Sequence, residues 1–348
     1  MTDLLRKYGI PLALGALALL PSCAKDNSPS TGEVSRQYLE LWMAEYHPGV
    51  TPKQENGIYI LSDEPGTGAA WDKSKAYTQA RVTIRTLTGT ITSTDDERLA
   101  QQLGTWAQGN YYGPGVYATG EGYMPAGVDA MLEDMRMGGT RTAVIPAWLT
   151  TTYRYATMQD YIDAATSSTH YIYTVTPVCQ IEDPVRWEKD SLTTYVKRHY
   201  GAQVKSRAVG EDIPADSSFY FVSDTTAFIG LEKLASGASV KLNYTGRLLN
   251  GQIFDTTDER TAKDAGIYNP SRTYEPASVT LASEYGDITM GGSNKLVKGF
   301  KAGLFSMHWK GQKAVVLFTS PLGYSTSGQG DAIPGYAPLL FELEFTED

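Results

Sequence analysis

Residues 240–257 read VKLNYTGRLLNGQIFDTT and carry a hairpin signal between two words rich in aromatic and polar residues. Before the turn, apolar side chains alternate with polar ones up to Tyr244, as they do on one face of a β-strand. The Asn-Gly pair at 250–251 strongly favours a tight hairpin turn, because both residue types tolerate positive φ. The stretch therefore predicts two paired strands, with Phe254 and Asp255 just after the turn.

Length and composition predict a globular protein of about two domains. The chain has 348 residues, of which 41% are hydrophobic and 20% charged. Its 23 tyrosines, 34 glycines and 17 prolines favour short strands joined by turns over long helices. The net charge of −9, without a basic patch, argues against a nucleic-acid partner. The four histidines and two cysteines are scattered, so we expect neither a metal site nor a cofactor.

The N-terminus is typical of an exported protein. Arg6 and Lys7 precede an apolar run over residues 9–20, which suits a signal-peptide core and is too short to span a bilayer. The run ends in Leu-Pro-Ser-Cys at 20–23, which resembles a bacterial lipobox. The alternative is an ordinary secretory signal in which Cys23 occurs by chance.

The lipobox resemblance implies that residues 1–22 are a signal peptide and that Cys23 is lipidated. Two or three acyl chains would then hold the protein stably on a membrane. Residues 23–34 are polar and suit a flexible tether. We expect the cell envelope of a Gram-negative bacterium, with an anchor in the outer membrane on its periplasmic or surface face. Cys179 would be left without an intramolecular disulfide partner, and we expect it in a strand.

The rest of the chain repeats one order of elements twice. Each copy has several alternating strands and one short apolar-striped helix, which begins near Val128 in the first and near Val297 in the second. This pattern predicts an α+β fold, with a helix packed on one face of a curved sheet in each copy. A further helix is expected over 183–200, capped by Asp183 and ended by Gly201. The predicted organisation is a helix and lead-in over 35–56, a first unit over 57–182, a helical linker over 183–210 and a second unit over 211–348.

The second unit resembles the FKBP-type peptidyl-prolyl cis-trans isomerases. Its matching words stand in the family's order: NYTG, NGQIFDTT, LVKGF, KGQKAVV, TSPLGYS and AIPGYAPLLFELEF. The first unit matches more faintly through ENGIYI, VTIRTLTG, GVDAMLEDMRMGGTRTAVIP and YIYTVTPV. The resemblance implies two FKBP-like domains, each a curved antiparallel sheet wrapped on a short helix, with isomerase activity in the second.

The resemblance also implies a hydrophobic substrate cup between the sheet and the helix of the second unit. Phe300 would form its floor, and the Tyr324 hydroxyl would reach the substrate carbonyl. The catalytic positions carried over from the family are Tyr244, Phe254, Asp255, Phe300, Tyr324 and Phe341, and the substrate-binding positions are Leu296, Val297, Gln329 and Ile333. Read without the motif order, the aromatic residues could be ordinary core residues and Asp255 a turn cap.

Such a cup suits the isomerisation of Xaa-Pro bonds. Rotation about a peptide bond faces a barrier of about 18–20 kcal/mol, which arises from amide resonance. The planar amide carries separated charge that water stabilises, so an apolar cup favours the twisted form. No nucleophile, metal or acid–base pair is required. The implied substrates are proline-containing peptides or unfolded exported proteins.

Several departures from the family keep a second class of function open. Gln329 stands where many members carry His, Ala277 replaces a common aromatic residue, and Ser325 replaces the usual Gly. The segments 258–278 and 282–295 look long enough to reshape the cup. The alternative is therefore a non-catalytic FKBP-like scaffold that binds peptides or a partner. Macrolide inhibitors of the family are candidate ligands of the altered wall.

The first unit departs further. Leu87 aligns with the wall tyrosine, and Val128 takes the floor position. No Phe-Asp pair follows, and Tyr173 alone keeps an aromatic residue near the closing strand. We expect a retained scaffold in which the cup has been lost.

Overall fold

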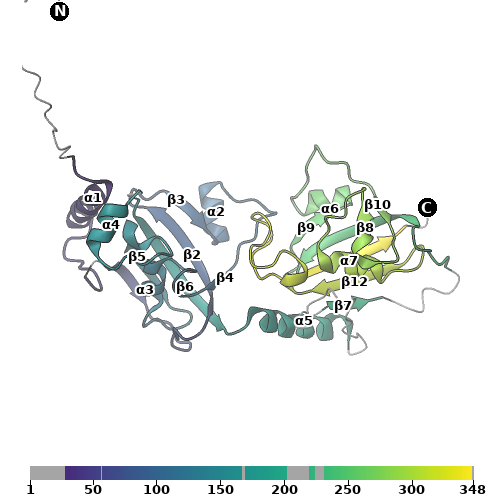
Figure 1. The fold of residues 1–348 in the computed structure, drawn as a ribbon, viewed down its shortest axis with the longest axis horizontal. Coiled ribbons are helices and arrows are strands. Elements are labelled where there is room, and N and C mark those ends of the chain that lie inside the picture. Colours follow the sequence, from purple (N-terminus) through teal and green to yellow (C-terminus); the bar gives the residue numbers. More distant parts are fainter. Residues whose placement is uncertain (1–27, 56, 167–168, 202–218, 224–230, 347–348) are drawn as a thin grey trace, which may run out of the picture.

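The computed structural model describes residues 28–346, apart from residue 56 and the segments 167–168, 202–218 and 224–230. The predicted signal peptide, the lipidation at Cys23 and part of the linker lie outside the described residues. Two antiparallel sheets lie side by side, and helix α5 (Pro184–Tyr200) leads from the first to the second (Figure 1). The predicted α+β class is confirmed.

The first sheet has the strand order β1-β5-β6-β2-β3, and β4 also pairs with β2. Its strands are β1 (Tyr59–Glu64), β2 (Tyr77–Thr86), β3 (Ile91–Thr94), β4 (Gly115–Ala118), β5 (Thr140–Ile145) and β6 (Tyr171–Ile181). The helices of this unit are α1 (Thr31–Tyr46), α2 (Glu97–Leu103), α3 (Ala126–Leu132) and α4 (Met158–Ala164), with a 3₁₀ turn η1 (Ala147–Leu149) after β5.

The second sheet has the order β11-β10-β8-β13-β12-β7, and β9 also pairs with β8. Its strands are β7 (Phe219–Val222), β8 (Ser239–Leu248), β9 (Ile253–Thr256), β10 (Ala277–Thr280), β11 (Thr289–Met290), β12 (Lys313–Phe318) and β13 (Leu339–Phe345). The helices are α6 (Glu259–Asp264) and α7 (Lys298–Phe305), with 3₁₀ turns η3 (Tyr285–Asp287) and η4 (Ser320–Leu322).

The two sheets share one topology, apart from β11, which is an additional edge strand of the second sheet. Strands β1, β5, β6, β2, β3 and β4 occupy the places of β7, β12, β13, β8, β9 and β10. In the first hairpin Thr83 faces Thr94 with their hydroxyls 2.8 Å apart, and in the second Thr245 faces Thr256 at 2.9 Å. Both hairpins then carry a register shift one residue further along. The duplication expected from the order of elements is therefore present in the strand register.

This register corrects one sequence alignment. Because Thr83 matches Thr245, the residue that corresponds to Tyr244 is Val82. The predicted match with Leu87 was wrong, because that residue lies beyond the end of β2. Tyr173 faces Ile84 as Phe341 faces Gly246, so the predicted match of Tyr173 with the closing strand is confirmed.

Each sheet is covered by helices on both faces. In the second unit α7 buries Phe300 and Leu304 against one face, and α5 buries Leu192 and Val196 against Leu317 on the other. In the first unit α3 packs on the inner face with Val128, Met131 and Leu132. Helix α1 packs on the outer face with Leu39 and Met43. The repeat thus includes the helix that precedes each sheet.

The termini of α5 follow from local chemistry, and the helix predicted over 183–200 is confirmed. The Asp183 carboxylate accepts the backbone N–H groups of Val185 and Arg186, and Pro184 occupies the first turn, where no N–H is needed. Gly201 ends the helix with φ of +75°. Across the described ranges, none of the helices is both long and apolar enough to cross a bilayer.

A loop of the first unit contacts the second unit. The Tyr111 N–H donates to the Asp331 carbonyl at 2.7 Å. The Gln252 amide donates to the carbonyl of Gly109, and the Gln108 amide donates to the carbonyl of Asp264, both at 2.9 Å. The loop before β4 therefore joins the two units through three hydrogen bonds.

Candidate active site

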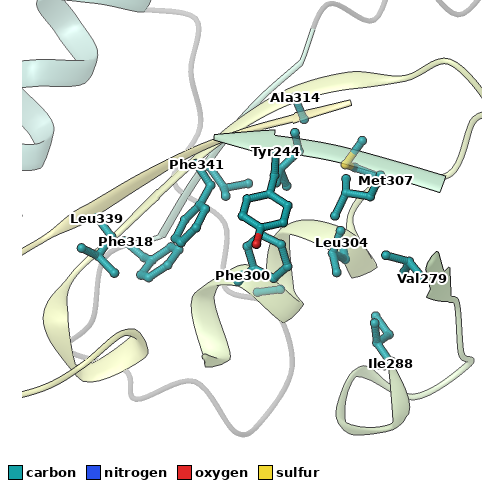
Figure 2. Packing of buried hydrophobic residues seen from close by; sticks show 14 of the residues in the cluster. Tyr244, Val279, Ile288, Phe300, Leu304, Met307, Ala314, Phe318, Leu339 and Phe341 are labelled. Atoms are coloured by element: carbon teal, nitrogen blue, oxygen red, sulfur yellow. The ribbon is translucent and has the colours of Figure 1, made fainter. Parts of the chain in front are cut away.

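Four aromatic rings form the wall and floor of the predicted cup. Phe341 on β13 lies 4.9 Å from Phe300 on α7 and 5.5 Å from Phe254 on β9, measured between ring centroids, with edge-to-face geometry. The Tyr244 ring packs edge-on against Phe300 at 5.4 Å (Figure 2). The exposed fractions of Tyr244, Phe300 and Phe341 are only 8%, 3% and 4%. These rings form a continuous apolar surface between the sheet and the helix.

Gly246 lets the rings come together. It lies opposite Phe341 across the β8–β13 pair. A Cβ at this position would lie 2.5 Å from the Phe254 ring and 2.8 Å from the Phe341 ring. The glycine in the sequence word NYTG therefore provides the space that two cup residues occupy.

Tyr244, Asp255 and Arg272 form a hydrogen-bonded triangle beside the rings. The Tyr244 hydroxyl donates to the Asp255 carboxylate at 2.8 Å. The Arg272 guanidinium contacts the other carboxylate oxygen at 2.5 Å and the Tyr244 oxygen at 3.2 Å. Burial, and then the charge of Asp255, raise the pKa of Tyr244 far above its ordinary value. The phenol thus stays protonated, and its hydrogen bond fixes the orientation of the ring.

Tyr324 lies in the loop after η4. The loop is held by backbone bonds from Ser325 to the Ser320 carbonyl at 2.8 Å and from Tyr336 to the Ser325 carbonyl at 3.0 Å. Ser325 has φ of +52°, a conformation that explains why glycine would be favoured there. Tyr324 is half-buried against the aromatic core. Burial, and then the charge of Asp255, raise the pKa of Tyr324 above its ordinary value.

The structure brings most of the predicted site residues together. Asp255 lies at the edge of the ring cluster, where it accepts the Tyr244 hydroxyl. Gln329 and Ile333 form a β-bridge through two main-chain hydrogen bonds. The Arg272 contact was not predicted, because no motif marks a residue within the long segment 258–278. The predicted residues that pack in or against one core cluster are Tyr244, Phe254, Leu296, Val297, Phe300, Tyr324, Ile333 and Phe341.

The corresponding place in the first unit is a cavity of about 370 Å³. Its lining includes Val82 and Tyr173, which match Tyr244 and Phe341 by strand register, and Val128 on α3, which the sequence places at the position of Phe300. The prediction that the cup is lost there needs correction. The aromatic set is largely replaced, as expected, but the smaller side chains leave an open apolar space.

Comparison with known proteins gives the family. The model for FKBP-type peptidyl-prolyl cis-trans isomerases matches residues 277–346. The chain is 30% identical over 112 residues to FK506-binding protein 2 of Dictyostelium discoideum, which covers 32% of this chain and 66% of that protein, just under two thirds of its length. It is also 30% identical over 115 residues to FK506-binding protein 1A of Aspergillus fumigatus, covering 33% of this chain and 81% of that protein. A bacterial relative, the FK506-binding protein of Neisseria meningitidis serogroup B, is 28% identical over 113 residues, covering 32% and 82%. The chain belongs to the FKBP-type peptidyl-prolyl cis-trans isomerase family.

Proposed function

We propose that this chain catalyses the cis-trans isomerisation of Xaa-Pro peptide bonds and that the cup of its second unit carries the activity. The observation that supports this most is the aromatic set around Phe300, with Tyr324 half-buried beside it. An apolar cup of this kind excludes water from a bound amide. It thereby disfavours the charge-separated planar form relative to the twisted transition state.

The roles of the individual side chains follow from their surroundings. The Tyr244 hydroxyl already donates a hydrogen bond to Asp255, so we assign Tyr244 to the wall of the cup and not to a hydrogen bond with the substrate. Tyr324 is the hydroxyl that we assign to the substrate carbonyl. Phe254 and Phe341 contribute ring edges and faces to the proline ring. A millionfold acceleration would require roughly 8 kcal/mol of differential stabilisation, all of it from positioning and desolvation.

One observation favours the alternative, a scaffold that holds peptides without turnover. The floor residue Phe300 and the closing residue Ile333 are each only 3% exposed. A substrate that reached the floor would first have to displace the surrounding side chains. Such a rearrangement could limit turnover while still allowing a peptide to bind at the rim.

Turnover of a short Xaa-Pro peptide separates the two functions. The soluble chain of residues 24–348 would be compared with Tyr324→Phe and Phe254→Ala, each checked for folding by circular dichroism. Tyr123→Phe, at a tyrosine that is 73% exposed on the first unit, is the matched control. Loss of turnover in the two cup variants alone, and inhibition by an FK506-type macrolide, would support the isomerase. A folded chain that leaves the uncatalysed rate unchanged would favour the scaffold.

We further propose that the protein acts on exported proteins from a lipid anchor at Cys23 in the outer membrane. Support comes from the basic-apolar leader and the Leu-Pro-Ser-Cys word at 20–23. Mass spectrometry of the mature N-terminus tests this, with Cys23→Ala as the comparison. A diacylglyceryl cysteine and release of the variant from the membrane fraction are expected. An unmodified Cys23 would contradict the anchor.

A further inference from the structure

The cavity of the first unit is apolar along most of its lining. Val82 and Val128 bound it where the second unit carries Tyr244 and Phe300, and Met124 adds a flexible thioether side chain. Because the matching side chains are smaller, the space that two rings fill in the second unit stays open here. A volume of about 370 Å³ is enough for a large aliphatic or aromatic side chain together with part of its backbone.

A carboxylate stands at the edge of this apolar space. Asp95 lines the cavity and accepts the Val82 N–H at 2.9 Å. In the second unit the hydroxyl of Thr257 accepts the matching N–H of Tyr244, also at 2.9 Å. The first unit has therefore kept the hydrogen bond to the strand and exchanged a hydroxyl for a carboxylate. The exchange adds a negative charge that the strand pairing itself does not need.

The carboxylate retains its charge near neutral pH. Burial raises the pKa of Asp95 to about 6, although its hydrogen bond from Val82 and the charge of Arg81 work in the opposite direction. The neighbouring charged and titratable groups are Arg81, Asp96, Tyr111 and Tyr117. The Arg81 guanidinium donates to the main-chain carbonyl of Asp95 at 3.2 Å, so this hydrogen bond goes to the backbone and not to the carboxylate.

A second, more polar pocket adjoins the cavity. It has a volume of about 260 Å³ and shares Thr94, Asp95 and Tyr117 with the cavity. Its lining includes Asp331 of the second unit, whose main-chain carbonyl accepts the Tyr111 N–H. A ligand that enters the apolar cavity could thus extend past Asp95 into a pocket that Asp331 also lines.

We propose that this composite site binds a peptide segment in which a large apolar residue stands next to Lys or Arg. The apolar side chain would occupy the cavity between Val82, Val128 and Tyr173. The neighbouring cation would lie between Asp95 and Asp331, where it gains charge-assisted hydrogen bonds. The site needs no proline in the peptide, so it is distinct from the isomerase cup and does not depend on the proposed activity.

Fluorescence anisotropy with proline-free peptides tests the proposal on residues 24–348. The probe is a fluorescein-labelled Gly-Ser-Phe-Lys-Ser-Gly, and the same peptide with Glu in place of Lys is the comparison. We expect the Lys peptide to bind at least about tenfold more tightly. Asp95→Asn removes the charge and keeps an acceptor for Val82, and should remove that preference. Val128→Phe restores the side chain of the second unit and should weaken both peptides.

The matched control is Phe254→Ala in the second unit, which should leave binding of the Lys peptide unchanged. Equal binding of the Lys and Glu peptides, or a preference that survives in Asp95→Asn, would overturn the proposal. So would an affinity that falls in Phe254→Ala instead, because the peptide would then sit in the cup. Absence of binding at millimolar peptide would also overturn it. Because Asp95→Asn changes no volume, its result stands even if Val128→Phe fails to fold.

Discussion

The Tyr244 hydroxyl on β8 lies 2.8 Å from the Asp255 carboxylate on β9, so a side-chain hydrogen bond joins the two strands of the hairpin. Arg272 completes the arrangement from the long segment after α6. The sequence suggested that the segment 258–278 would reshape the cup. In the structure this segment supplies the Arg272 cation, which pairs with the Asp255 carboxylate. The orientation of the Tyr244 ring therefore depends on the hydrogen bonds of its hydroxyl with Asp255 and Arg272.

Replacing Asp255 should therefore affect both stability and turnover. Asp255→Ala leaves a mostly buried phenol without its acceptor, and we expect a loss of about 1–3 kcal/mol in the free energy of unfolding. Asp255→Asn keeps an acceptor and should lose less. Urea denaturation and peptide isomerisation measure the two effects. Asp264→Ala, at an exposed carboxylate, is the control. Equal stability of the Ala variant and the parent chain would contradict this role.

Gly246→Ala should damage the cup through packing alone. The added methyl group would lie within 2.8 Å of both the Phe254 and Phe341 rings. Overpacking of this kind typically costs about 1–3 kcal/mol, and the displaced rings should reduce turnover further. Gly286→Ala is a suitable control, because a Cβ there meets no atom within 4 Å. Unchanged turnover in a folded Gly246→Ala variant would show that the rings need not approach so closely.

The contact between α5 and the second unit should depend on pH. Glu188 is fully buried, and its carboxylate accepts the Ser320 hydroxyl at 2.7 Å. Burial raises the pKa of Glu188 to about 7, although its hydrogen bonds from Ser320 oppose the shift. The folded chain binds the Glu188 proton more tightly than the unfolded chain does. The contribution of protonated Glu188 to the free energy of unfolding is therefore fully present below pH 4.5 and is lost as pH rises through about 7. The full change amounts to roughly 3 kcal/mol.

Glu188→Gln stays neutral throughout this range and can still bond Ser320 on both sides. Its unfolding free energy should exceed that of the parent chain at pH 8, and the difference should shrink towards pH 4.5. Urea midpoints across this pH range provide the measurement, with the exposed Glu121→Gln as control. Parallel profiles for the parent and Glu188→Gln would show that Glu188 does not carry the dependence.

His170 should make the attachment of α1 sensitive to acid. Its Nδ1 accepts the Ala147 N–H at 2.9 Å, and its Nε2–H donates to the Ser35 carbonyl of α1, also at 2.9 Å. Burial lowers the pKa of His170, so its contribution is present above pH 6.5 and is lost as pH falls through the lowered value. An NMR titration of the ring should give a pKa below 6.5. A titration at or above 6.5 would contradict this assignment.

Local chemistry explains which parts of the fold the sequence predicted well. The Asn-Gly turn and the Asp183, Pro184 and Gly201 signals of α5 act over a few residues, and both elements form as expected. The match of Leu87 with Tyr244 was wrong because it was based only on the similarity of the short sequence words around them. The correct alignment follows from the cross-strand pair of Thr83 and Thr94, which corresponds to Thr245 and Thr256 and cannot be identified from the sequence alone.

The same division applies to the site. The order of motifs identified Phe254, Phe300 and Phe341, and their rings do meet. Arg272 was missed because its contact depends on how a long loop folds back over the hairpin. The cavity beside Asp95 was missed because it arises from side chains that are too small to fill a space. The volume left between residues depends on the whole packing and cannot be read from one position.

The three hydrogen bonds between the loop before β4 and the second unit have a consequence for how the protein can evolve. Each of them ends on a main-chain carbonyl, at Gly109, Asp264 or Asp331. Side chains at Asp264 and Asp331 can therefore be exchanged while the acceptors stay in place. Descendants of this chain could alter what either unit recognises and still inherit the same arrangement of the two units.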